Sequence, residues 1–370
     1  MKKLAYVGVD YHIKTVTIAV YLADEKQFHD TRHLTNDDKT IKKYMKKLSK
    51  LFQIKICYEA SSSGYVFQRK MQALGYHCDV IAPSLVPKKA GDKRKNDFRD
   101  SQKLAKNYAN EELTIVHPPT EQEESVRSLV RLRLSIKESE KRVKQQINSF
   151  LLSQGHRWPK SNWTQQHLNW MATLQLSDSN LLLVLQEYLG HLEYLQSRLG
   201  YIDQKIKLLA QTELYATSIK KLKAMRGIGT LTAMILIVEI TDFRRFPTPR
   251  SLMAFLGLIP AEDSSGGNSK EVGLTKTGNH RCRSALIESV RHYIKKPYMS
   301  AAMRQKLSQA DAHSAVIAKK CMHRLHKRYW TLVMKGKIAN KAIAAIAREF
   351  AGFIWALMQP APVVDGQTKA

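Results

Sequence analysis

The opening of the chain, residues 1–112, alternates short apolar runs with segments of helical character. Leu4–Asp10 and Thr15–Leu22 are rich in β-branched and aromatic residues, and the short polar connection between them predicts an antiparallel hairpin. A third strand is expected over Phe28–Leu34. The elements expected after it are a helix over Asp38–Leu51, a strand over Ile54–Glu59, a helix over Tyr65–Leu74, a strand over Cys78–Ile81 and a helix over Asp97–Tyr108.

The order of these elements predicts a fold class. Three meandering strands followed by strand–helix alternation is the layout of an RNase H-like α/β domain. We expect this domain to span residues 1–112.

Residues 113–216 carry apolar residues at spacings typical of long helices. In the second half of this region they step by four and three residues without a gap: Leu181, Leu185, Tyr188, Leu192, Leu195, Leu199, Ile202, Ile206 and Leu209. An earlier, interrupted run comprises Leu129, Leu132, Ile136, Val143, Ile147 and Phe150. Sustained heptads of this kind predict a coiled-coil arm. The two segments could pair with each other as an antiparallel hairpin or with another protomer, and an arm of this length favours a homo-oligomer, a dimer or a tetramer.

The last region, residues 217–370, is predicted to be mainly helical with one loop-rich interruption. An apolar helix over Leu231–Glu239 follows the segment Gly227-Ile-Gly229. Glycines at such a position let the backbone approach a phosphate, although a lone Gly-x-Gly is equally typical of a tight turn. The interruption covers residues 258–269 and 273–279, which are rich in Ser, Thr, Gly, Lys and Asn.

The net charge of the chain indicates what kind of partner it binds. Sixty Lys+Arg against 32 Asp+Glu leave a formal charge of +28, with a sequence pI of about 9.9. Such an excess favours a polyanionic partner, here nucleic acid, because no apolar run is long enough for a membrane span. Four scattered cysteines without a CxxC pair suit a reducing compartment. We expect a cytoplasmic, nucleoid-associated protein with no membrane contact.

Acidic residues at three separate places predict a metal site. Asp10 and Glu59 each end an apolar strand, and Asp97 and Asp100 lie three residues apart on one helix face. Carboxylate oxygens are the ligands that Mg²⁺ prefers, and two such ions can bind the attacking and leaving oxygens of a phosphodiester. The four residues are therefore predicted to bind two Mg²⁺ ions, with Mn²⁺ as a possible substitute.

Two further groups of residues could contact nucleic acid or react with it. Ser264 and Ser265 precede two glycines, where a hydroxyl would be accessible as a nucleophile, although Ser-Ser-Gly-Gly is equally a linker composition. Basic residues that could contact phosphate surround the predicted sites, and in some places they could equally form a solvated helix face: Lys93, Arg94, Lys95, Lys276, Arg281 and Arg283.

These residues resemble a known family, the DEDD insertion-sequence transposases, whose relatives include pilin-gene inverting recombinases. The matching segments run in order through nearly the whole chain: Gly8-Val-Asp10, Tyr58-Glu-Ala-Ser61, Lys95-Asn-Asp-Phe-Arg-Asp-Ser101, Gly227-Ile-Gly229, Leu256-Gly-Leu-Ile-Pro260, Ser264-Ser-Gly-Gly267, Thr275-Lys-Thr-Gly-Asn279 and Ala344-Ala-Ile-Ala-Arg348. Asn96 and Ser101 stand where the family usually has Thr and Ala, and neither difference removes a carboxylate.

The resemblance implies a RuvC-like N-terminal domain in which Asp10, Glu59, Asp97 and Asp100 hold Mg²⁺. It implies a C-terminal transposase domain whose loop serine, Ser265 or Ser264, attacks DNA and forms a phosphoserine link. It also implies donor and target double-stranded DNA and an element-encoded guide RNA as partners. We therefore expect a DNA transposase or recombinase. The alternatives are a RuvC-like junction resolvase that uses water and a nucleic-acid-binding protein without catalysis.

Overall fold

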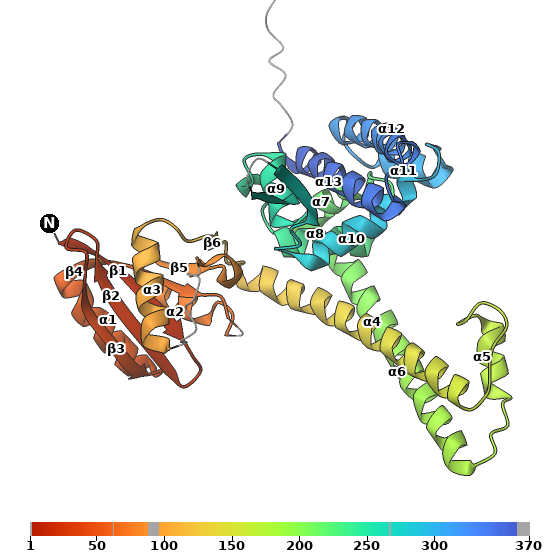
Figure 1. Cartoon of the computed structure of the whole chain (residues 1–370), viewed down its shortest axis with the longest axis horizontal. Helices are drawn as coiled ribbons and strands as arrows, with labels where there is room; N and C mark the ends of the chain where they lie inside the picture. The colour runs from red at the N-terminus through yellow and green to blue at the C-terminus, as the bar shows by residue number, and fades with distance from the viewer. Residues whose placement is uncertain (1, 62, 88–95, 266–267, 361–370) are drawn as a thin grey trace, which may run out of the picture. The chain divides into compact units, whose positions relative to one another are not determined.

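The structure, a computed structural model, describes residues 2–61, 63–87, 96–265 and 268–360, without the side chains of residues 262–272. The chain divides into two compact units, Met1–Pro119 and Thr120–Ala370 (Figure 1). The predicted further division of the second unit, into an arm over 113–216 and a domain over 217–370, stays a prediction. Among the described helices, none is both long enough and apolar enough to cross a bilayer.

A six-stranded mixed sheet forms the centre of the first unit, in the order β3-β2-β1-β4-β5-β6. β1 pairs antiparallel with β2 and parallel with β4; β2–β3 and β5–β6 are antiparallel, and β4–β5 are parallel. The strands are β1 (Lys3–Tyr11), β2 (Thr15–Leu22), β3 (Gln27–Thr35), β4 (Phe52–Glu59), β5 (Cys78–Ile81) and β6 (Ile115–Val116). The expected mixed α/β N-terminal region is confirmed.

Helices cover both faces of this sheet. α1 (Asp38–Leu51) and α2 (Val66–Ala73) pack through Met45 and Phe67 against one face. α3 (Asp97–Ala109) packs through Leu104 and Ala105 against the other, where β1 presents Gly8. The alternation of side chains along β1 explains this division, because successive residues of a strand point to opposite faces. A short 3₁₀ helix, Pro83–Leu85, follows β5.

The second unit is mostly helical, as expected. Its α-helices are α4 (Glu121–Ser153), α5 (Gln165–Ala172), α6 (Ser179–Leu209), α7 (Glu213–Lys223), α8 (Thr230–Ile240), α9 (Pro249–Phe255), α10 (His280–Val290), α11 (Ala301–Ser308), α12 (Ala312–Met334) and α13 (Ala339–Met358). Two 3₁₀ helices, Phe243–Arg245 and Arg291–Tyr293, connect some of them.

The two long helices α4 and α6 pack against each other within one chain (Figure 1). Every predicted apolar position of α6, from Leu181 to Leu209, is buried or half-buried. On α4 the prediction was wrong at Leu132, which is 50% exposed, because Val126 and Val130 occupy the packed face instead. The pairing that the sequence left open is therefore made by α4, and supercoiling of the pair stays a prediction.

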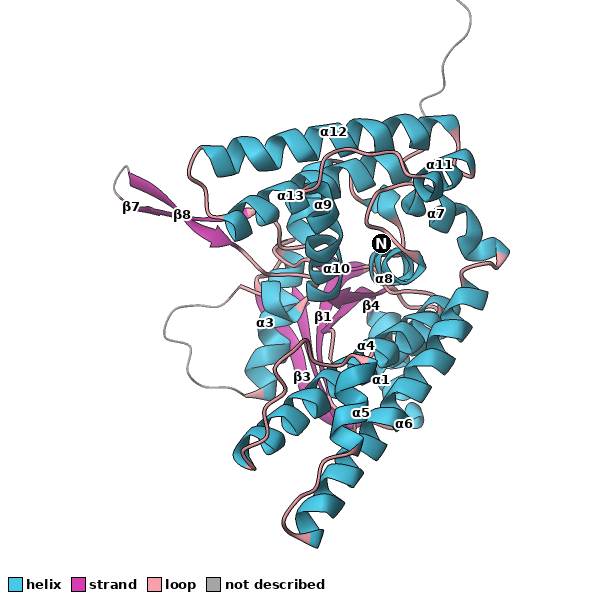
Figure 2. Ribbon diagram, turned by 90° about the vertical axis from the view of Figure 1, so that its right-hand side faces the viewer, coloured by secondary structure: helices cyan, strands magenta, loops and turns pink. Residues whose placement is uncertain are grey.

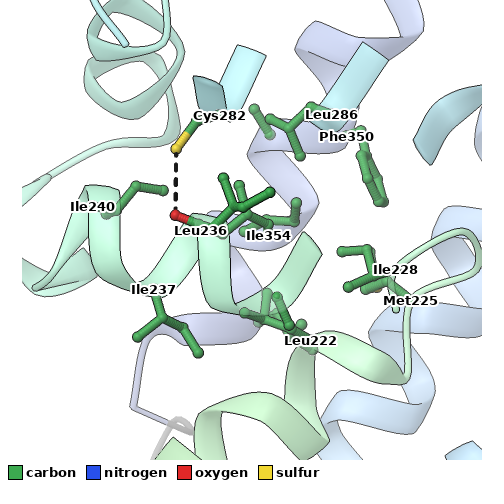
Figure 3. Packing of buried hydrophobic residues seen from close by; sticks show 14 of the residues in the cluster. Leu222, Met225, Ile228, Leu236, Ile237, Ile240, Cys282, Leu286, Phe350 and Ile354 are labelled. Carbon is green, nitrogen blue, oxygen red and sulfur yellow. Dashed lines mark hydrogen bonds between the residues drawn. The ribbon is translucent and has the colours of Figure 1, made fainter. Parts of the chain in front are cut away.

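The core of the second unit surrounds α8, whose residues from Ala233 to Ile240 are all buried. Figure 3 shows Leu236 of this helix among side chains from α10 and α13, including Leu286 and Phe350. A helix that is apolar on every side must be enclosed by its neighbours, and here α4, α6, α7 and α10 supply most of the enclosure. This explains why the region folds as one body around a single helix.

The interruption predicted as loops is in fact a strand pair. β7 (Pro260–Ser265) and β8 (Asn268–Leu274) form an antiparallel hairpin, seen as two adjacent strands beside the helices in Figure 2. The hairpin was not predicted because its strands are polar and lack the alternation of a half-buried sheet. Ser265 and Asn268 form the last described pair of the ladder.

Candidate functional site

Two of the predicted carboxylates come from neighbouring strand ends in the first unit. Val9 of β1 pairs in register with Tyr58 of β4, so Asp10 and Glu59 are the next residues along two adjacent parallel strands. Adjacent strands lie roughly 4.8 Å apart, and paired residues of parallel strands point to the same face. The backbone therefore brings Asp10 and Glu59 to one edge of the sheet, as the sequence predicted.

The other two carboxylates come from the first turn of α3, which approaches β1 unusually closely. The backbone of α3 at Ser101 and Ala105 lies directly over Gly8: a Cβ added there would be 2.3 Å from the Ser101 carbonyl oxygen and 2.4 Å from the Ala105 nitrogen. No residue larger than glycine fits this contact without movement of the helix. Because Asp97 lies one turn before Ser101, and Asp10 lies two residues after Gly8, the contact carries Asp97 towards Asp10.

The structure brings three possible ligands together at this point. One ligand atom each from Asp10, His12 and Asp97 lie within 4.8 Å of one another. The imidazole of His12 lies 3.3 Å from Asp10 Oδ2, and its side chain is half exposed. Sequence reasoning missed His12, which directly follows the end of β1.

The electrostatics of Asp10 reflect this crowding. Burial raises the pKa of Asp10, and the nearby carboxylates of Asp97 and Asp100 raise it further, which outweighs the opposite effect of His12. A carboxylate that is disfavoured by like charges gains most from a bound cation. The N-terminal end of α3 partly offsets the repulsion, because its free amides favour the negative charges of Asp97 and Asp100.

The donor set fits a hard divalent cation. Carboxylate oxygens with one imidazole suit Mg²⁺ or Mn²⁺, and the pKa of Asp10 is raised first by burial and then by the charges of Asp97 and Asp100, both of which a bound cation would offset. Glu59 and Asp100 are not in the tight group of three. Glu59 reaches the same sheet edge through the strand register, and Asp100 is close enough to act on Asp10.

The predicted nucleophiles lie at the end of β7 in the second unit. Ser264 pairs with Ser269, and Ser265 with Asn268, while the serine side chains are outside what the structure describes. The base of the hairpin is held by backbone hydrogen bonds that join the turn after α9 to the loop before α10. Thr275 N–H donates to Ile259 O at 3.0 Å, and Asn279 N–H donates to Phe255 O at 3.1 Å.

An ion pair between the buried Glu239 and the partly exposed Arg131, which sequence reasoning missed, supports this loop. The guanidinium of Arg131 on α4 donates two hydrogen bonds to Glu239 of α8, at 2.7 and 2.8 Å. The side-chain amide of Asn279 donates to the same carboxylate at 2.7 Å, and its oxygen caps α10 by accepting from Arg281 N–H and Cys282 N–H. Burial works to raise the pKa of Glu239, but these contacts outweigh it and the pKa is lowered. The network ties the long helix α4 to the loop that follows β8.

The predicted basic contacts have different outcomes. Lys93, Arg94 and Lys95 lie outside the described residues. Lys276 is exposed and adopts a left-handed backbone conformation, with φ of 54°. Arg283 instead has a structural contact, because its guanidinium donates to Leu256 O at 2.9 Å.

The glycines before α8 differ from each other. Gly227 has φ of +84°, and a Cβ there would lie 2.3 Å from Ser289 O of α10, so close packing alone requires glycine. Gly229 forms the N-terminal cap of α8 and has open space around it. Contact with a phosphate at either glycine stays a prediction.

Comparisons with known proteins identify the family of this chain. A family model described as "Transposase IS116/IS110/IS902 family" matches residues 219–304, and the IS110 DEDD model, described as "Transposase", matches residues 7–155. A protein of Sinorhizobium fredii named "Putative transposase y4qE" is 33% identical over 362 residues, covering 96% of this chain and 89% of that protein. The chain belongs to the IS110 family of DEDD transposases.

Two further transposases match most of the chain. The transposase of the insertion sequence element IS1533 from Leptospira borgpetersenii is 29% identical over 342 residues, covering 91% of this chain and 99% of that protein. The transposase of IS1328 from Yersinia enterocolitica is 24% identical over 290 residues, covering 77% and 85% respectively. The two family models together cover the carboxylate cluster and the hairpin with Ser264 and Ser265.

Proposed function

We propose that this chain is a DNA transposase that excises and inserts a mobile element by metal-dependent cleavage and rejoining of DNA strands. One observation carries the proposal: the ligand atoms of Asp10 and Asp97, 87 residues apart in sequence (97 − 10), converge in a member of the IS110 family. DNA as the substrate is supported by the similarity to transposases and by the formal charge of +28.

The first unit is proposed to be an RNase H-like, RuvC-like catalytic domain. The sheet order supports this proposal, because three antiparallel strands are followed by two parallel ones, with Asp10 on the central β1 and Glu59 on its parallel neighbour β4. α3 then supplies Asp97 and Asp100 from above the sheet. The order Asp, Glu, Asp, Asp is also the order of the letters in the family's name.

These four carboxylates are proposed to hold Mg²⁺, with Mn²⁺ able to replace it. When bound, the ions would supply positive charge to the phosphodiester and its leaving oxygen. The chain's own contribution is positional: β1 and β4 fix two carboxylates on rigid strand ends, and the Gly8 contact fixes α3 against them. His12 beside Asp10 can orient that carboxylate or exchange a proton near it.

Strand exchange is proposed to use a serine, with Ser265 favoured over Ser264. The hydroxyl oxygen of the serine forms an ester bond to the attacked phosphorus while the bond from phosphorus to one DNA oxygen breaks. The hydroxyl proton passes to solvent or to the leaving oxygen, so charge and atoms balance. The ester conserves the energy of the phosphodiester until the strands are rejoined, which hydrolysis by water would not do.

Two partners belong to the proposal through the family resemblance. One is a structured guide RNA encoded by the element, and the large positive charge without a recognisable base-reading motif supports it. The other is a second protomer, since the proposal combines sites in a dimer or tetramer. The apolar seam of α6 is covered by α4 of the same chain, so association would use other surfaces of the arm.

A denaturing gel tests the proposed chemistry. Labelled DNA carrying the element end is incubated with the protein, Mg²⁺ and RNA transcribed from the element. We expect a protein-linked DNA species that is absent with EDTA, with Asp10→Ala, and with the Ser264→Ala/Ser265→Ala double variant.

Two results would favour the alternatives. If DNA is cut without a protein-linked species, and the double serine variant cuts equally well, water is the nucleophile and the protein acts as a resolvase. If the wild type binds DNA but breaks no strand with any divalent metal, the protein is a nucleic-acid-binding protein without catalysis.

A further inference from the structure

A cationic pocket lies in the second unit, well separated in sequence from both the carboxylates and the serine hairpin. It occupies about 240 Å³ where the end of α6 and the helix α7 meet α11. Its lining residues are Ala210, Gln211, Ala216, Ile219, Lys220, Lys223, Lys306 and Gln309. Three lysines and two primary amides thus line one concavity, and the described lining contains no Asp or Glu.

The lysines crowd one another. Burial lowers the pKa of Lys306, and the positive charge of Lys223 lowers it further, so these two ammonium groups are close enough to interact. The ammonium of Lys306 also lies 3.5 Å from the carbonyl oxygen of Ile228, in the turn between α7 and α8. Asp311 does not line this pocket; its carboxylate interacts with Lys221 and accepts two hydrogen bonds from Ser314.

Like charges converging on a partly buried surface are unfavourable unless an anion completes the site. A phosphate group matches the pocket chemically, because its oxygens can accept hydrogen bonds from ammonium groups and from side-chain amides together. The volume suits one phosphate and leaves no room for a folded macromolecule. The opening on the surface allows a polymer to present a phosphate from outside.

We propose that Lys220, Lys223 and Lys306 bind one backbone phosphate of a nucleic acid at the junction of α6, α7 and α11. The inference rests on the proposed nucleic-acid function and adds to it a specific anchoring site. A nucleic-acid phosphate is favoured over free phosphate because the whole chain carries a formal +28. The pocket is next to the turn 224–229, because Lys306 contacts the carbonyl oxygen of Ile228.

The site also has a mechanical consequence. Lys220 and Lys223 belong to α7, whereas Lys306 belongs to α11, more than 80 residues later (306 − 223 = 83). A phosphate that bridges them would draw α7 and α11 together just where the long helix α6 ends. Binding of nucleic acid would then stiffen the connection between the α4–α6 pair and the helices around α8.

Salt dependence of binding tests the proposal. Fluorescence anisotropy of labelled duplex DNA and of a labelled RNA hairpin is measured with full-length protein over a series of KCl concentrations. Each phosphate contact contributes roughly 0.9 to the slope of log K against log[KCl] on duplex DNA. We expect the Lys220→Gln/Lys223→Gln/Lys306→Gln variant to lose about one unit of slope with at least one of the two nucleic acids.

The matched control removes the same charge elsewhere. Lys42, Lys46 and Lys47 are exposed on α1 of the first unit, and their triple change to Gln should leave the slope within error. Because Lys306 also contacts Ile228, the double variant Lys220→Gln/Lys223→Gln keeps the test valid if the triple variant melts at a lower temperature.

The outcomes are distinct. A loss of slope confined to DNA or to RNA supports the proposal and identifies the source of the phosphate. Slopes equal to wild type with both, or reduced no more than in the α1 control, overturn it, even if inorganic phosphate raises the melting temperature of the wild type alone. The slopes report binding and not strand cleavage. An Asp10→Ala variant that still recombined DNA would refute the proposed chemistry without changing them, so failure of the proposed chemistry and failure of this site are distinguishable.

Discussion

Adding one methyl group at Gly8 should change the positions of the clustered carboxylates without removing any of them. Gly8→Ala leaves every proposed ligand in place, but the new Cβ would lie 2.3 Å from Ser101 O and 2.4 Å from Ala105 N. Ordinary contacts of a Cβ begin at 3.4 Å, so α3 must move away from β1 by about 1 Å (3.4 − 2.3). Asp97 moves with the helix, whereas Asp10 stays on the strand.

Two effects of different size are expected. Overpacking of this kind destabilises a domain by about 1–3 kcal/mol, which leaves most of the protein folded. A displacement of about 1 Å at a catalytic group can lower the rate by about 100-fold. Gly8→Ala should therefore reduce recombination far more than it reduces the amount of folded protein.

The assay pairs thermal unfolding with quantitative detection of recombined DNA. Gly200→Ala is the matched control, because a Cβ at this exposed helical glycine of α6 meets no atom within 4 Å. That variant should gain about 1 kcal/mol of stability from helix propensity and recombine like wild type. If Gly8→Ala has wild-type melting temperature and activity, the close packing of α3 on β1 does not build the site.

Three further predictions concern packing and charge. Leu192→Asp, at a side chain 2% exposed in the α4–α6 pair, should lower the free energy of unfolding by at least about 3 kcal/mol. The control Tyr194→Asp, at a side chain 61% exposed on the same helix, should change it by less than about 0.5 kcal/mol. Equal losses would show that the interface between α4 and α6 is not packed. Glu239→Gln should destabilise by about 1–2 kcal/mol at neutral pH, because the charge-assisted hydrogen bonds from Arg131 are lost while its guanidinium, 42% exposed, can be hydrated. Because the pKa of Glu239 is lowered in the folded protein, the stability that its carboxylate contributes should be complete above the ordinary pKa of glutamate and should disappear as the pH falls through the lowered value. A stability difference between wild type and Glu239→Gln that persists below that pH would contradict the ion pair. Asp10→Asn should raise the melting temperature of the metal-free protein at neutral pH, because burial and the neighbouring carboxylates disfavour the charge of Asp10. Since the pKa of Asp10 is raised, this gain should disappear below the ordinary pKa of aspartate. A loss of stability at neutral pH would show that the charge of Asp10 is not disfavoured in the folded protein.

Local patterns were enough to predict most of the secondary structure. The expected helix over Asp38–Leu51 coincides with α1, and the expected strands and helices of the first unit differ from the observed ones by a few residues at their ends. Hydrophobic periodicity and capping are properties of neighbouring residues, so a sequence displays them directly.

Features that depend on distant contacts could not be predicted in the same way. The heptads of α6 identify the packed face but not its partner, and the exposed Leu132 shows that α4 follows a different phase from the one its apolar residues indicated. The β7–β8 hairpin joins polar strands, which carry no burial pattern. The pairing of Arg131 with Glu239 spans 108 residues, and no local signal links them.

Only part of the candidate site could be predicted from local pattern. The positions of Asp10 and Glu59 at strand ends, and of Asp97 and Asp100 on one helix turn, were predictable from local pattern. Their convergence depends on distant contacts, namely the register of β1 with β4 and the close approach of α3 to Gly8. His12 was missed because a lone histidine after a strand is common and becomes informative only beside Asp97.

Recombination in cells by single carboxylate variants is the most direct test of the metal-dependent centre. A plasmid carrying the element and its flanking DNA supplies both the DNA and any guide RNA, and recombined junctions are counted by quantitative PCR. Asp10→Ala and Asp97→Ala should each reduce junctions by more than about 100-fold, beyond the loss typical of residues that only support a metal ligand, at unchanged protein level and DNA binding. Asp37→Ala, which removes an exposed helix cap in the same unit, should recombine at close to the wild-type rate. Recombination by Asp10→Ala or Asp97→Ala at the rate of the Asp37→Ala control would contradict the account.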